Sequence, residues 1–136
     1  MHTQPLPVQE RRRQRSGDRI RAIQLLLDRV RTQHDQEILV VADADGLLVA
    51  ASGSPEAAEA LAAYAPLLHR TPHGRARAGL LAHLSTWSPG ATADGLHVRR
   101  ITIEEATFFV AAAGPRNSRT EAGLFRAQTG LVRILR

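Results

Sequence analysis

Two carboxylates, Asp43 and Asp45, lie within the segment ILVVADADGLLVAASG, residues 38–53, between two apolar runs. Paired aspartates after a buried strand can transfer a phosphoryl group, one as nucleophile and the other as acid or base beside Mg²⁺. That reaction also needs a cation for the phosphate and a further acidic pair for the metal. The chain has no lysine, and Leu47 stands where this phosphatase motif takes Thr or Val. We therefore predict that Asp43 or Asp45 binds turn amides and that neither is catalytic.

The remaining residue types do not assemble another reaction centre. All 18 basic residues are arginines and there is no cysteine, which excludes lysine and cysteine nucleophiles and thiolate metal sites. No G-x-S-x-G motif occurs. His69 and His73 have i, i+4 spacing, but Pro72 and Gly74 interrupt the helix that would align them. We predict no catalytic residue, no cofactor and no metal site.

The segment Gly114–Arg119 precedes a predicted helix and is a candidate anion site. Backbone amides at a helix start bind anions, and Arg116, Ser118 and Arg119 would add donors. The same residues also fit an ordinary connection, because Ser118 and Glu121 have the spacing of a capping box. We favour the connection.

The N-terminal residues are rich in arginine, with Arg11, Arg12, Arg13 and Arg15 close together and no apolar periodicity. We predict a disordered basic tail at residues 1–16 and a single domain at residues 17–136. Arg11–Arg15 could bind nucleic acid or an anionic membrane, but interleaved aromatic residues are missing and a solvated tail is favoured. With no leader sequence or membrane span recognisable, we expect a cytoplasmic protein.

Hydrophobic periodicity predicts the order helix, hairpin, helices, hairpin, helix. The first helix should begin at Asp18, and residues 38–42 and 47–51 should be strands joined by a turn in which Gly46 has a positive φ. Ser54 and Pro55 predict the start of a second helix. Leu80, Leu81, Leu84 and Trp87 favour a further helix, although a strand is also consistent. Residues 96–103 and 107–113 form the second hairpin, with a bulge expected at Arg99–Arg100.

With these elements in order, residues 18–113 resemble the roadblock family of dynein-light-chain-like proteins. The resemblance rests on the leading helix, the D-x-D-G turn, the exit Ala50–Gly53 into SPEAAEALAAYA and the ending TFFVAAAG. It implies an α+β fold, an antiparallel sheet of four to five strands sandwiched by helices. Residues 131–135 or 79–84 are candidates for the fifth strand. The same order resembles a small GAF-type sensor domain, which would instead need a concave ligand pocket.

The roadblock resemblance also implies a function without a catalytic centre. We expect a homodimeric regulatory or scaffolding module that binds another protein, a Ras-like small GTPase, with a GAF-like small-molecule sensor as the alternative. The contact surface should include one sheet edge and the second helix. The candidate interface residues on that helix are Ala58, Leu61, Ala62 and Ala65.

Overall fold

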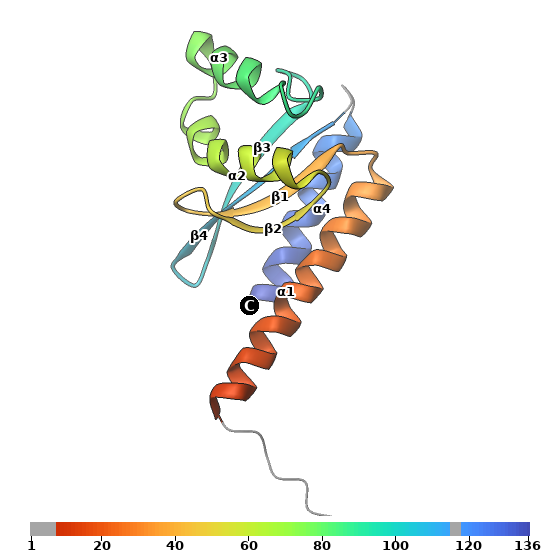
Figure 1. Ribbon diagram of the computed structural model, residues 1–136, viewed down its shortest axis with the longest axis vertical. Helices are drawn as coiled ribbons and strands as arrows, with labels where there is room; N and C mark the ends of the chain where they lie inside the picture. Colours follow the sequence, from red (N-terminus) through yellow and green to blue (C-terminus); the bar gives the residue numbers. More distant parts are fainter. Residues whose placement is uncertain (1–7, 115–117) are drawn as a thin grey trace, which may run out of the picture.

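The computed structural model describes residues 8–114 and 118–136, apart from the side chains of Glu10 and Ser118. These residues form four helices and four strands in the expected order, whose arrangement can be followed in Figure 1. They are α1 (Val8–Gln33), β1 (Ile38–Asp43), β2 (Leu48–Ser52), α2 (Pro55–Arg70), α3 (Gly74–Leu84), β3 (Leu96–Ile103), β4 (Ala106–Ala113) and α4 (Ser118–Leu135).

The strands form one antiparallel sheet in the order β2-β1-β4-β3. This confirms the α+β class and the sandwiched antiparallel sheet. Both segments proposed as a fifth strand are wrong, because residues 79–84 lie in α3 and residues 131–135 lie in α4. Leu81 and Leu84 are three residues apart in α3, and Ala127 and Leu131 are four apart in α4. These buried side chains recur at helical spacing, so each pair lies on one side of its helix.

Helices cover both faces of the sheet, so the core has two layers (Figure 1). α1 and α4 cover one face, where Ile23, Leu27 and Leu124 pack on Leu39 and Val41. α2 and α3 cover the other face, where Ile38 and Val40 belong to a second cluster. Adjacent residues of β1 therefore enter opposite layers, which explains why the run is continuously apolar.

The two hairpins follow from their turn residues. Gly46 has φ +84°, as predicted, and a Cβ at this position would lie 3.2 Å from the carbonyl oxygen of Ala63. The second hairpin turns at Glu104 and Glu105, both with positive φ. The bulge predicted at Arg99–Arg100 is wrong: β3 pairs with β4 in continuous register, and the register shift lies between Val41 and Ala42.

The predicted start of the first helix is also wrong, because α1 begins at Val8, ten residues before Asp18. Residues 8–16 are therefore helical where a disordered tail was expected, while residues 1–7 lie outside the described part of the chain. Gln, Glu and Arg are good helix formers, and a helix already held by packing extends by one hydrogen bond per residue. Apolar periodicity detects only the part of a helix that packs.

Candidate interaction surface

The two carboxylates of the first hairpin lie at its turn, as predicted. Oδ1 of Asp43 accepts hydrogen bonds from the backbone N–H groups of Asp45 at 2.9 Å and Leu47 at 3.0 Å. The N–H of Asp43 donates in turn to the carbonyl of Leu47. One carboxylate oxygen of Asp43 thus closes the turn, which is the role of aspartate in an Asx turn.

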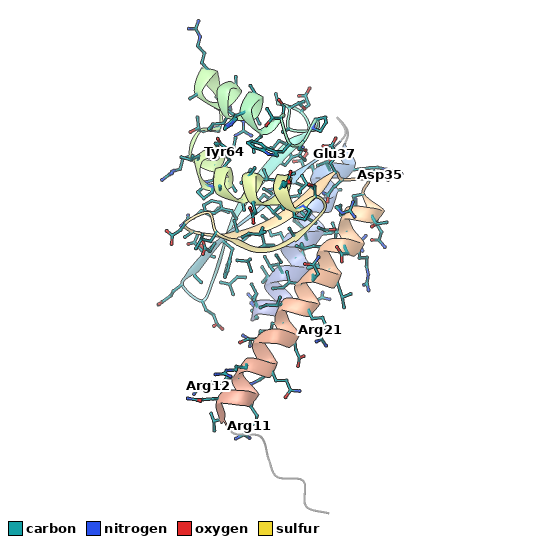
Figure 2. The ribbon with its side chains drawn as sticks, in the orientation of Figure 1. Arg11, Arg12, Arg21, Asp35, Glu37 and Tyr64 are labelled. Atoms are coloured by element: carbon teal, nitrogen blue, oxygen red, sulfur yellow. The ribbon has the colours of Figure 1, made fainter. Side chains whose placement is uncertain are left out.

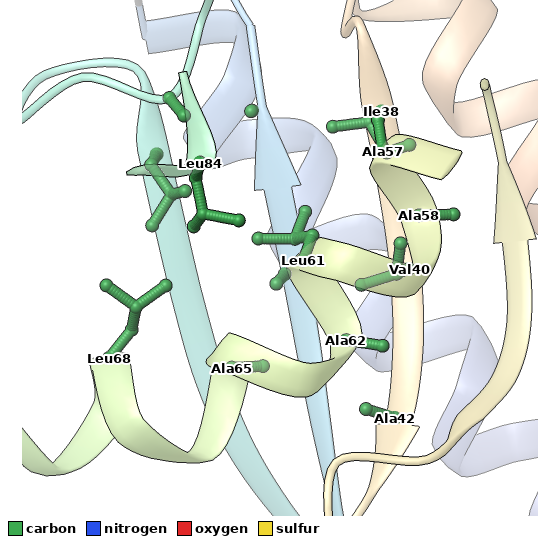
Figure 3. Close-up of a cluster of buried hydrophobic side chains, with 14 of the residues drawn as sticks. Ile38, Val40, Ala42, Ala57, Ala58, Leu61, Ala62, Ala65, Leu68 and Leu84 are labelled. Atoms are coloured by element: carbon green, nitrogen blue, oxygen red, sulfur yellow. The ribbon is translucent and has the colours of Figure 1, made fainter. Parts of the chain in front are cut away.

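The residues proposed for a dimer contact on α2 do not lie on its outer side. Ala58, Ala62 and Ala65 have no exposed surface and Leu61 is 3% exposed. Figure 3 shows them in the buried cluster between α2 and the sheet, to which Val40 and Ala42 of β1 also belong. The small side chains allow α2 to lie close to the sheet of its own chain. An apolar face on a helix has the same sequence pattern whether a sheet or a second protein covers it.

The candidate anion site is only partly described. Arg116 and the side chain of Ser118 lie outside the described residues. Arg119 forms an ion pair with Asp35, Nη1 to Oδ2, at 2.7 Å. This guanidinium therefore connects the start of α4 to the end of α1.

Two of the histidines, His69 and His83, contact aromatic rings. His69 lies 5.5 Å from the ring of Phe109, and His83 contacts Tyr64 and Trp87. Nδ1 of His83 is hydrogen-bonded to the hydroxyl of Tyr64. Across the residues described, His, Asp and Glu do not form a group of three placed to hold a metal ion.

Among the described residues, β2 and β3 are the edge strands of the sheet, and the outer edge of β3 has no strand beside it. The N–H of Gly114 donates to the carbonyl of Gly95 at 3.0 Å, and antiparallel hydrogen bonds recur at every second residue pair. The backbone groups of Val98, Arg100 and Thr102 consequently point away from β4. They form a row of donors and acceptors that another strand can satisfy.

The opposite edge, formed by β2, is partly covered by α1. The amide of Gln24 donates to the carbonyl oxygen of Ala51 at 2.6 Å. Nε of Arg31 donates to Oγ of Ser52 at 2.6 Å. The contact to Ala51 occupies a backbone carbonyl that a partner strand would need, and the contact to Ser52 places the Arg31 side chain against the same strand, so β3 is the more accessible edge.

A groove of about 650 Å³ runs beside the β3 edge. Its residues come from α3, β3, α4 and the connections at the ends of α3, and they include Arg77, Ala78, Leu81, Val98, Arg99 and Glu121. Arg99 lies 3.5 Å from Glu121, between their side-chain Nη2 and Oε1 atoms. Apolar side chains and two opposite charges thus border a row of open backbone groups, which suits an extended polypeptide.

The sequence did not point to this groove. Leu96, Val98, Ile101 and Ile103 indicated a strand, but the edge position of that strand depends on pairing with β4. Arg77 and Leu81 reach the groove only because α3 packs on α2 near the same end of the sheet. Neither composition nor hydrophobic periodicity indicates a groove that forms between elements distant in the sequence.

No family model matches the chain, and no curated protein matches it either. Among solved structures, Myxococcus xanthus MglB is similar, with a TM-score of 0.50 and 12% sequence identity over 85% of this chain and 88% of that chain. At this identity the likeness concerns the fold alone. It supports a roadblock-like arrangement of the sheet and helices.

Proposed function

We propose that the chain is a non-enzymatic regulatory or scaffolding module that forms a homodimer and binds another protein, a Ras-like small GTPase. The roadblock-like fold supports this assignment. The observation that carries it is the free edge of β3 beside the groove between α3 and α4. A strand edge binds through backbone hydrogen bonds and needs no catalytic group.

We assign the β3 edge to a second copy of the chain. Antiparallel pairing of two β3 strands would join two four-stranded sheets into one and satisfy the backbone groups of Val98, Arg100 and Thr102. This replaces the buried face of α2 as the proposed dimer contact. Arg77 and Leu81 would then border the second strand.

An edge-directed substitution tests the dimer. Arg100 is exposed and its N–H points outward, so Arg100→Pro removes a donor from the free edge and none from the β3–β4 ladder. Arg100→Ala is the matched control, because it removes the same side chain and keeps the N–H. Light scattering at high micromolar concentration should give a dimer for the wild type and Arg100→Ala and a monomer for Arg100→Pro. A wild-type monomer at that concentration would contradict the dimer.

The GTPase partner needs a separate experiment. The immobilised chain is incubated with lysate of the native cell, and any recovered GTPase is assayed for nucleotide exchange and hydrolysis with and without the chain. We expect a GTPase to be retained and one of the two rates to change. Recovery of no protein, together with a small molecule that co-purifies with the chain, would favour the GAF-like sensor.

A further inference from the structure

The outer side of the α1–α4 layer, turned away from the sheet, carries two rows of exposed side chains. On α1 the row is Arg21, Leu25 and Arg29, and on α4 it is Phe125, Thr129 and Arg133. Members of each row are four residues apart and so are neighbours on one side of their helix. Leu25 and Phe125 are each 61% exposed, so each row presents one large apolar side chain to the solvent beside its arginines. We call these rows, with Arg126, the basic outer face.

The two rows meet at a groove of about 360 Å³ between the helices. Arg29, Arg126 and Arg133 line it together with Phe125, and its lining contains no acid. Arg126 donates to the side-chain oxygen of Gln33 at 3.3 Å. Within the described residues, the arginines of the basic outer face form no ion pair. Their charge is therefore available to an external anion.

The N-terminal part of α1 extends this basic surface beyond the sheet. Figure 2 shows Arg11 and Arg12 on a part of α1 that projects away from the sandwich. Arg11 precedes Arg29 by eighteen residues, about five helical turns, so the two point in a similar direction about 27 Å apart. Among the acids between Arg11 and Arg29, Asp18 points most nearly in the same direction as these two arginines.

Although arginine has a high helix propensity, the charges of these arginines do not stabilise the helix that carries them. Arginine near a helix N-terminus opposes the helix dipole, and Arg11, Arg15 and Arg19 repeat at the i, i+4 spacing at which like charges repel. Both effects lower the stability of a segment that has no packing against the sheet. Anionic groups beside these arginines would offset both the unfavourable interaction with the helix dipole and the repulsion between the arginines.

We propose that the basic outer face docks on an anionic lipid bilayer. Two isolated apolar side chains among many cations match peripheral membrane binding, in which arginines attract anionic headgroups while Leu25 and Phe125 enter the interface. A protein interface also takes up arginine and aromatic residues, but it places them around a contiguous apolar core, which two separate apolar side chains do not form. Phosphate contacts with a nucleic acid duplex would leave Leu25 and Phe125 without a role. No helix within residues 8–114 or 118–136 has the length and apolar content of a membrane span, so the contact is peripheral.

Vesicle co-sedimentation tests the proposal. The full chain is mixed with vesicles of phosphatidylcholine alone or with 30% phosphatidylglycerol, at 50 and 300 mM salt. We expect binding only with phosphatidylglycerol and much weaker binding at high salt. The double variant Arg21→Gln/Arg29→Gln should weaken binding by roughly 20- to 30-fold, since each arginine near an anionic surface contributes about five-fold.

A matched double variant controls for net charge. Arg70→Gln/Arg75→Gln removes two exposed arginines from α2 and α3, on the other side of the sheet. It should bind almost as tightly as the wild type. Equal losses in the two double variants, or no binding to phosphatidylglycerol at 50 mM salt, would overturn the proposal. Binding to a random-sequence DNA duplex without binding to vesicles would overturn it in favour of nucleic acid.

A fluorescent probe reports insertion directly. Trp87 is the only tryptophan and follows α3, whose residues Leu81 and Leu84 pack in the cluster on the other face of the sheet. In the variant Trp87→Phe/Phe125→Trp, the emission maximum should shift to the blue when anionic vesicles are added. The wild type, with tryptophan at residue 87, should show no such shift. An unshifted emission from residue 125 in the bound state would contradict insertion of Phe125.

Discussion

The carboxylate of Asp43 accepts the backbone N–H of Leu47 across the first hairpin turn, at 3.0 Å. The same oxygen accepts the N–H of Asp45. Two turn amides therefore share one acceptor, and Asp45 itself contributes its backbone to this arrangement. The D-x-D-G sequence is explained by a turn that needs an acceptor at its first position and a positive φ at Gly46.

The first prediction concerns this acceptor. Asp43→Asn keeps a side-chain oxygen and should change the free energy of unfolding little. Asp43→Ala leaves two backbone amides without their side-chain acceptor and should lower the free energy of unfolding by about 1 kcal/mol. Asp45→Asn should be neutral. Urea unfolding of the three variants measures the differences. Magnesium-dependent phosphatase activity that disappears in Asp43→Asn would contradict the structural role.

The second prediction separates the core of the chain from an interface on α2. Ala62 has no exposed surface and faces the sheet, whereas Ala63 is exposed. Ala62→Leu should lower the free energy of unfolding by about 1–3 kcal/mol, because the added atoms cannot fit between α2 and β1. Ala63→Leu, the same change one residue later, should have little effect. Thermal unfolding of the two variants tests this, and equal stability would show that residue 62 is not in a packed core.

Local sequence signals predicted most of the fold. Asp43–Gly46 specifies a turn through the chemistry of its own residues. Pro55 marks the start of α2 as predicted, although the side chain of the N-cap residue Ser54 makes no capping hydrogen bond. The apolar runs of β1 and β4 follow from their central positions, because both faces of a central strand are covered. Each of these features depends on residues close together in the sequence.

The interaction surfaces could not be predicted in this way. Ala58 and Ala62 formed the correct apolar face of α2, but the sequence did not show that the sheet of the same chain covers it. The groove beside β3 requires α3 and α4 to border one edge from two sides. The projecting arginines of α1 gave no periodic signal, because they pack against nothing.

The third prediction concerns two glycines with different surroundings. A Cβ at Gly95 would lie 2.5 Å from the carbonyl oxygens of both Gly90 and Gly114, whereas a Cβ at Gly79, within α3, would meet no atom within 4 Å. Gly95→Ala should destabilise the chain by about 2 kcal/mol or more, because backbone segments must separate. Gly79→Ala should stabilise it by about 0.5–1 kcal/mol, since alanine favours the helix. Opposite shifts of the urea midpoint are the expected result.

The last prediction is that the domain folds without residues 1–15. Residues 11–15 are exposed, and the core contacts of α1 begin at Ile23, so deletion removes helix without removing core packing. Cooperative urea unfolding should persist with a similar midpoint, and far-ultraviolet circular dichroism should show a loss of helical signal. Because the deletion also removes Arg11 and Arg15, binding to anionic vesicles should weaken while the fold is kept. Loss of cooperative unfolding would instead mean that this part of α1 contributes to the core. The prediction that the domain folds without residues 1–15 would then be wrong.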